Sequence, residues 1–165
     1  ADGKHVAMKR LAILALAVLP LACATPRAGT TKSTSTPGHG AIKLTVTPNP
    51  VIATNVGGNT YEFPIDVVVK ETGGHPVTIE RVTANVFTAG GIQVASESYD
   101  AAKIQSLGFA TAIQARGELH YHFAPRKDVP DERLFTSVYG DVRVEGIDDN
   151  GSRTSTTTTI TLKKR

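Results

Sequence analysis

Beyond residue 41 the chain alternates apolar and polar side chains with a period of two, and this pattern limits the possible folds more than any other feature. The alternation runs through Ile42–Val46 and recurs over 61–69, 118–123, 138–144 and 156–162. Successive side chains of a β-strand point to opposite faces of the sheet. Each run therefore predicts a strand with one buried face, and together they predict an all-β fold.

Turn signals separate these runs at intervals typical of short sequential strands. Glycine pairs stand at 73–74 and 90–91, and Asp149-Asn150-Gly151 is a strong hairpin signal. Pro48 and Pro50 interrupt the first run, as in an edge strand that switches between sheets. The sequence predicts an immunoglobulin-like β-sandwich of about seven or eight strands. Trp is absent and aromatic residues make up 5% of the chain, so aliphatic side chains must fill the core.

A change of parity predicts one irregularity in this sandwich. Val77 and Ile79 share one parity, whereas Val82 and Ala84 share the other. A strand cannot change the face it buries without an extra residue. We therefore expect a β-bulge near Glu80-Arg81.

One short helix is expected at Asp100–Gly108. Asp100 can cap the free N–H groups of the first turn, and Gly108 can take the left-handed conformation that ends a helix. A helix in this position would connect the two sheets of the sandwich.

Residues 8–24 have the three parts of a secretory signal peptide. Met8, the only Met, precedes Lys9-Arg10, an apolar stretch follows, and small residues end the segment. A transmembrane helix needs about 20 apolar residues, so this shorter stretch indicates export. We interpret residues 1–24 as a leader, in which 1–7 are a cloning remnant or upstream read-through.

Cys23 is the only cysteine and directly follows Leu21-Ala22. This segment resembles the lipobox of bacterial lipoproteins, which implies acylation of Cys23 as the new N-terminus, although Pro20 stands where that family prefers Leu, Val or Ile. The alternative is ordinary cleavage after Ala24. The first route predicts a lipoprotein anchored in the membrane, in the periplasm or at the cell surface. The second predicts a secreted or periplasmic protein, and neither permits a disulfide within the domain.

Residues 25–40 are rich in Thr, Ser, Gly, Pro and Ala, which predicts a flexible tether before a domain at 41–165. The charge follows this division. Residues 1–37 hold five basic residues and one acidic residue, whereas the remainder holds 13 basic and 14 acidic residues. The domain therefore lacks the concentrated positive charge that nucleic-acid binding requires, and we expect no nucleic-acid partner.

The last hairpin carries a family resemblance. The segment Val142-x-Val144-x-Gly146-x-Asp148-Asp149-x-Gly151, followed by a Thr-rich strand, resembles the closing hairpin of bacterial Ig-like and fibronectin type III-like domains. Thr47-Pro48-Asn49-Pro50 is similar to their first strand. The resemblance covers nearly all of residues 41–163. It implies an adhesion, spacer or binding module of the cell envelope.

Two groups of residues are candidates for binding a metal ion. His120 and His122 lie at i and i+2 of a predicted strand, so both rings face one side and could share a copper or zinc ion. A third ligand is needed, and otherwise the two side chains are solvated on an outer face. Asp148-Asp149-Asn150 offers oxygen atoms to Ca²⁺, but the same residues are those a tight turn prefers.

No pattern of catalytic residues stands out. There is no Gly-x-Ser-x-Gly motif and no phosphate-binding glycine loop before a helix. Asp131-Glu132 neighbour Arg133 in the expected charged loop Pro125–Arg133, where solvated ion pairs are the default. Tyr99 and Tyr139 are too few to form a sugar-binding platform.

We therefore expect no enzyme and no cofactor. The predicted function is that of a non-enzymatic cell-envelope or secreted Ig-like module, acting through protein contacts or as a structural or adhesion accessory. Its partners would be an envelope protein or component, and the membrane itself if Cys23 is acylated. The alternative is a periplasmic metal-binding protein that uses His120 and His122.

Overall fold

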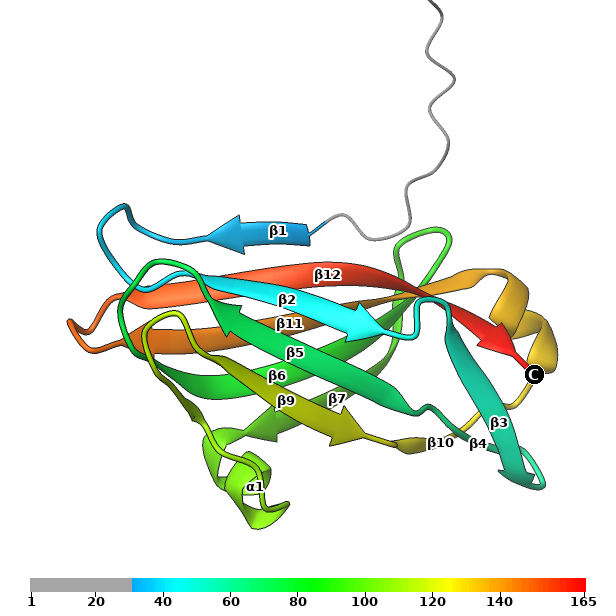
Figure 1. The fold of residues 1–165 in the computed structure, drawn as a ribbon. Helices are drawn as coiled ribbons and strands as arrows, with labels where there is room; N and C mark the ends of the chain where they lie inside the picture. Colours follow the sequence, from blue (N-terminus) through cyan, green and yellow to red (C-terminus); the bar gives the residue numbers. More distant parts are fainter. Residues whose placement is uncertain (1–30) are drawn as a thin grey trace, which may run out of the picture.

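The computed structural model describes residues 31–165, which form two β-sheets packed face to face (Figure 1). The predicted signal peptide, Cys23 and the first part of the predicted tether lie outside the described residues. In chain order the elements are β1 (Thr31–Thr34), β2 (Ile42–Thr47), β3 (Val51–Gly57), β4 (Thr60–Glu62), β5 (Ile65–Glu71), β6 (Val77–Thr88), β7 (Gln93–Asp100), α1 (Ala101–Ser106), β8 (Ala112–Ile113), β9 (Glu118–Phe123), β10 (Arg126–Asp128), the 3-10 helix η1 (Glu132–Thr136), β11 (Val138–Asp148) and β12 (Arg153–Lys164). The predicted all-β sandwich with one short α-helix is confirmed.

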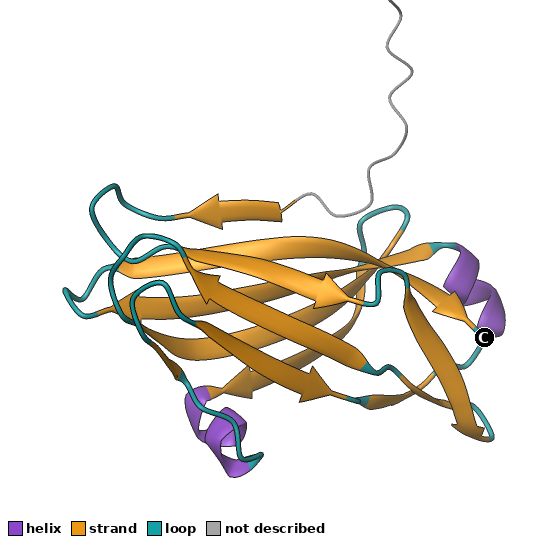
Figure 2. Cartoon of the chain, viewed as in Figure 1, coloured by secondary structure: helices purple, strands orange, loops and turns teal. Residues whose placement is uncertain are grey.

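The larger sheet has the strand order β10-β4-β3-β12-β11-β6-β7, with β1 also paired to β12 and β8 to β6; the smaller sheet has the order β2-β5-β9. In the lettering of immunoglobulin domains, β2, β5 and β9 correspond to strands A, B and E. Strands β6, β11 and β12 correspond to C, F and G. The two short helices lie toward opposite ends of the sandwich (Figure 2).

The core lies between the inward rows of the two sheets. In β2 the burial alternates strictly, with Ile42, Leu44 and Val46 buried. The ring centroids of Tyr99 in β7 and Phe123 in β9 are 4.6 Å apart, so an aromatic stack joins the two layers at one side. The other buried aliphatic residues of this core are Val51, Ile65, Val67, Val69, Val77, Ile79, Val82, Ile104, Ile113, Val142, Val144, Ile160 and Leu162.

The predicted bulge is confirmed in β6. Arg81 lies opposite Glu145 of β11, but Ile79 lies opposite the next residue, Gly146. Glu80 is therefore the extra residue, and it lets both halves of β6 bury their apolar side chains.

The predicted short helix is α1, which connects β7 to β8. The carboxylate of Asp100 accepts a hydrogen bond from the backbone N–H of Lys103 at 2.8 Å, and Gly108 has a φ of 85°. Ile104 is the residue that α1 buries. Across residues 31–165, neither helix has the length or the apolar character to cross a bilayer.

Strand β1 forms within the segment that was expected to be an unpaired tether up to residue 40. It pairs antiparallel with β12, and hydrogen bonds of polar side chains explain this pairing. The last strand carries an inward row of threonines that need hydrogen-bond partners. The Ser33 hydroxyl donates to Thr156 Oγ1 at 3.2 Å, and Thr154 Oγ1 donates to the carbonyl of Thr34 at 3.3 Å.

The link between β2 and β3 changes sheets at Pro48-Asn49-Pro50, as expected. The Asn49 side chain contacts β12 here: its amide nitrogen donates to the carbonyl of Thr159 at 3.4 Å, and its oxygen accepts the backbone N–H of Thr161 at 3.0 Å. The amide group thus takes the place of one peptide of a pairing strand. Strand β1, Asn49 and β3 together cover the edge of β12.

The segment Pro125–Arg133, expected to be a charged loop, contains regular structure. Strand β10 pairs with β4, and the Arg126 guanidinium contacts the Glu62 carboxylate at 2.9 Å. Asp131 then begins η1 by accepting the backbone N–H of Arg133 at 2.9 Å. One long-range and one local polar contact therefore order a segment that has little apolar content.

Two buried carboxylates hold the chain where it enters the sandwich. Asp148 accepts the backbone N–H of Gly40 at 2.9 Å, and Glu71 accepts that of Ala41 at 3.2 Å. The other backbone N–H donors are those of Asn150 and Ser152 to Asp148, and those of Gly73, Gly74 and Arg116 to Glu71. Consecutive residues of the entering chain are thus fixed to two different turns.

These donors lower the pKa of both carboxyl groups. For Asp148, the hydrogen bond from the Gly40 N–H lowers the pKa most. Burial raises the pKa, and the other donors lower it further, to about 2 from 3.8. Burial raises the pKa of Glu71, but its backbone donors, first that of Arg116, bring it below its ordinary value. Because both folded pKa values lie below the unfolded ones, this stabilisation is complete above the unfolded pKa and is lost as the pH falls through the folded pKa.

We expect the Asp148→Asn variant to be less stable than the wild type at neutral pH and to lose less stability on acidification. The amide cannot carry the charge that the backbone donors stabilise. Urea unfolding at a series of pH values, from neutral to about pH 2, measures both effects. Asp149→Asn, an exposed neighbour in the same turn, is the control. If the free energy of unfolding fell equally between pH 3.8 and about 2 in the wild type and in Asp148→Asn, the lowered pKa would not belong to Asp148.

Candidate functional site

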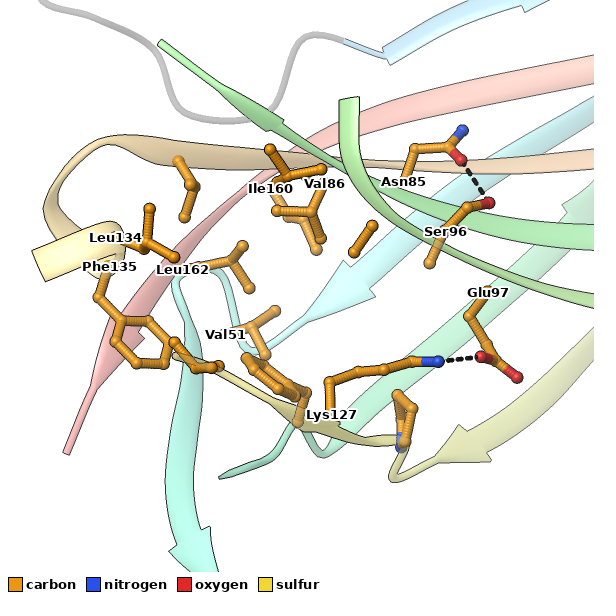
Figure 3. Close-up of a pocket in the computed structure, with 18 of the residues that line it drawn as sticks. Val51, Asn85, Val86, Ser96, Glu97, Lys127, Leu134, Phe135, Ile160 and Leu162 are labelled. Carbon is orange, nitrogen blue, oxygen red and sulfur yellow. Dashed lines mark hydrogen bonds and ion pairs between the residues drawn. The ribbon is translucent and has the colours of Figure 1, made fainter. Parts of the chain in front are cut away.

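A cavity of about 380 Å³ opens on the inner face of the larger sheet, near the 3-10 helix η1 (Figure 3). Its lining is almost wholly apolar. One wall consists of inward residues of the larger sheet, from β6, β11 and β12. The opposite wall comes from the start of β3, from the link between β4 and β5, and from β10 and η1. The lining includes Val51, Phe63, Ala84, Val86, Glu97, Lys127, Phe135, Ile160 and Leu162.

The cavity exists because the smaller sheet has three strands and the larger sheet extends beyond it. At this end, the inner faces of β6 and β7 face the segment from β10 to η1, which belongs to the other margin of the larger sheet, and not a strand of the smaller sheet. Ala84 is a small residue of this wall, where a larger side chain would extend into the cavity. Gly140 also lines the wall, but it is closely packed, since a Cβ there would lie 3.0 Å from Ile160 Cγ1. The apolar surface here is therefore reachable from outside.

Aromatic contacts and one ion pair fix η1 as the end wall. The Phe135 ring meets the Tyr61 ring edge-on with centroids 5.1 Å apart, and lies 6.3 Å from that of Phe63. Glu132 accepts the hydroxyl of Tyr61 and the ammonium of Lys164. These contacts tie η1 to β4 and β12, so the wall does not depend on the loop alone.

Three charged residues meet at the other end of the cavity. The Lys127 ammonium lies 2.6 Å from one carboxylate oxygen of Glu97, and the Lys103 ammonium lies 3.0 Å from the other (Figure 3). The hydrogen bonds from Lys127 and then Lys103 lower the pKa of Glu97. Glu97 points inward from β7, the edge strand of the larger sheet. An inward charge on an edge strand opposes the addition of a further strand.

The sequence-predicted histidines lie elsewhere, on the outer face of the smaller sheet. Both are exposed, and each contacts a carboxylate: His120 Nε2 is 3.0 Å from Glu118, and His122 Nδ1 is 2.8 Å from Asp66. Within residues 31–165, no group of three or more His, Cys, Asp or Glu side chains is arranged to hold a metal ion. The third ligand that a metal site needs is not supplied by this face.

The other predicted candidates have structural roles. Asp148 accepts backbone hydrogen bonds within its turn, as the turn interpretation of Asp148-Asp149-Asn150 requires. Tyr99 stacks on Phe123 between the sheets, and Tyr139 stacks on Phe87 with centroids 5.4 Å apart. The two tyrosines do not form a shared platform.

Sequence reasoning did not find the cavity. Its walls come from the same alternating rows that predict the core, so nothing in the pattern separates a filled interior from an open one. Lys127 carries a weak signal: it lies opposite the buried Tyr61 and so takes an inward position. This inward position can be recognised once the pairing of β10 with β4 is known.

No protein-family model matches the sequence, and no curated protein sequence matches it significantly. Several solved structures are similar in arrangement. A structural genomics target shares 13% identity over 73% of this chain and 86% of its own, with a TM-score of 0.49. The putative ApaA protein from Bordetella pertussis shares 10% over 73% and 93%, with a TM-score of 0.46. A CARDB domain from Pyrococcus furiosus, in complex with di-metal ions, shares 9% over 79% and 100%, with a TM-score of 0.34. Since these TM-scores are below 0.5, the account of the fold rests on this chain's own strand pairing.

We expect Ala84→Leu to raise the free energy of unfolding by about 0.5–2 kcal/mol, the usual gain from filling a cavity. The added side chain would bury apolar surface in space that already exists. Chemical denaturation measures the change. Ala112→Leu, the same change at an exposed strand position of β8, is the control and should not stabilise. A loss of stability in Ala84→Leu would mean that the wall at this position is already closely packed.

Proposed function

We propose that this chain is an exported, non-enzymatic immunoglobulin-like module of the cell envelope that acts by binding an apolar ligand. The observation that carries the proposal is the open apolar cavity of about 380 Å³. Ligand sites are concave, mostly apolar cavities of roughly 300–1,000 Å³ with a few polar groups that orient the ligand. This cavity has that composition, since its charged groups are confined to one end.

The physical basis of binding would be burial of apolar surface. Each CH₂ group removed from water contributes about 0.8 kcal/mol. The half-buried side chains of Phe63, Val86 and Val138 offer apolar contacts in the walls of the cavity. The aromatic contacts of Phe135 hold the end wall in place, so the ligand would not have to order it.

Protein contacts at a sheet edge are the other route by which such a module could act. Strand β7 is the edge of the larger sheet, and its Val94 is exposed. However, inward-pointing Glu97 and the two lysines that hold it oppose strand addition at this edge. We therefore place the ligand in the cavity and not at β7.

The leader places this module outside the cytoplasm, and acylation of Cys23 would anchor it. Thr31, where β1 begins, comes eight residues after Cys23. An extended chain spans at most about 3.3–3.6 Å per residue. An acylated Cys23 would therefore keep the start of β1 within roughly 30 Å of the lipid surface.

We expect the full chain to bind a neutral, environment-sensitive fluorophore such as N-phenyl-1-naphthylamine at one saturable site, because the cavity excludes water from the ring system. Fluorescence titration measures this binding. Ala84→Phe should abolish it by filling the cavity.

The matched control is Ala112→Phe, which places the same side chain on an exposed strand and should leave the titration unchanged. Absence of saturable binding to the wild type, or equal binding by both variants, would remove the cavity as the site.

We expect mass spectrometry of the protein from bacterial membranes to show acyl chains on Cys23. Cys23→Ser should release the protein from the membrane fraction, because the anchor cannot form without the thiol. A mature N-terminus at Thr25 would instead establish plain cleavage, in which case export stands and the anchor does not.

A further inference from the structure

We infer that the cavity takes a ligand with a single unbranched alkyl chain that ends in a carboxylate. The inference rests on the proposed function and adds the chemical class of the ligand. It follows from two properties of the site: the volume and lining of the cavity, and the charge at one end.

The volume favours one chain. About 380 Å³ is near the lower end of the range for ligand cavities, so the space suits a narrow ligand better than a branched or two-chain lipid. Phe135 and Lys127 lie at different sides of the lining residues, with Val51 between them (Figure 3). Between these residues the walls are aliphatic, which suits an alkyl chain.

Two ammonium groups share one carboxylate at the open end, since Glu97 contacts both Lys127 and Lys103. The charged neighbours of Lys127 on β10 have other partners, although Asp128 also lines the cavity. Arg126 contacts Glu62 at 2.9 Å, and Asp128 accepts the hydroxyl of Thr60 at 2.6 Å.

The charged residues near the end wall are paired with one another. Glu132 and Lys164 satisfy each other, and Asp131 is paired with Arg133. Lys127 is therefore the cation that lines the cavity, and the lining carboxylates of Glu97 and Asp128 already have partners. An anionic head group complements the charge of Lys127, whereas a cationic one does not.

Lys127 has the geometry to receive such a head group. It occupies an inward position, because it lies opposite the buried Tyr61 in the pairing of β10 with β4. An ammonium has three donors, and Glu97 uses one of those of Lys127. The remaining donors can bind a carboxylate at the end of a chain whose alkyl part lies in the cavity.

The test compares three ligands with the same twelve-carbon chain and different head groups: dodecanoate, dodecanol and dodecyltrimethylammonium. Each competes with the neutral fluorophore for the full chain, below its micelle concentration. A charge-assisted hydrogen bond to Lys127 should make dodecanoate bind about tenfold more tightly than dodecanol. The ammonium ligand should bind more weakly than the alcohol.

Two variants should change the affinity for dodecanoate in opposite directions. Lys127→Gln should remove the preference for dodecanoate and leave dodecanol unchanged, because the walls are intact. Glu97→Gln should strengthen dodecanoate binding, because it removes the carboxylate that competes for the lysines. Lys43→Gln, on the outer face of the smaller sheet, is the control and should change neither affinity.

The outcomes separate the two proposals. Equal affinities of dodecanoate and dodecanol, or weaker dodecanoate binding in Glu97→Gln, would overturn the carboxylate inference while the apolar site stands. Failure of all three ligands to displace the fluorophore, together with unchanged fluorophore binding in Ala84→Phe, would overturn the proposed function itself.

Discussion

Burial of the inward aliphatic rows between the two sheets is the interaction on which the rest of this domain depends. The only cysteine is Cys23, so residues 31–165 have no covalent cross-link and must be held by packing and hydrogen bonds. The packing is made mainly of Val and Ile, with an aromatic stack between Tyr99 and Phe123 at one side. Every other feature, including the carboxylates that fix the entering chain, is positioned by the two stacked sheets.

Much of this architecture could be predicted because alternation reports burial directly. The parity change before Val82 located the bulge at Glu80, and Asp100 and Gly108 bounded the helix. The features that were missed depend on long-range pairing of short polar segments. Strand β1 forms because threonines of β12 need partners, and β10 forms because Arg126 and Lys127 meet β4. No local pattern of four or fewer residues carries that information.

The candidate site was missed for a related reason. A cavity in a β-sandwich is a mismatch between two sheets, and each sheet taken alone has an ordinary sequence. Val86 and Ile160 have the same inward orientation as the residues of the filled core, and they line a cavity because the smaller sheet has no strand opposite them. His120 and His122 had the clearer pattern, yet the topology gives them no third ligand among the described residues.

The covering of β12 by β1, Asn49 and β3 also affects how molecules meet one another. An uncovered last strand would offer its peptide groups to any neighbouring chain, and molecules held densely on one surface collide often. Here the backbone on that side is already occupied, and the opposite margin carries an inward charge at Glu97. These two strands, β12 and β7, are therefore protected against pairing with a strand of another copy.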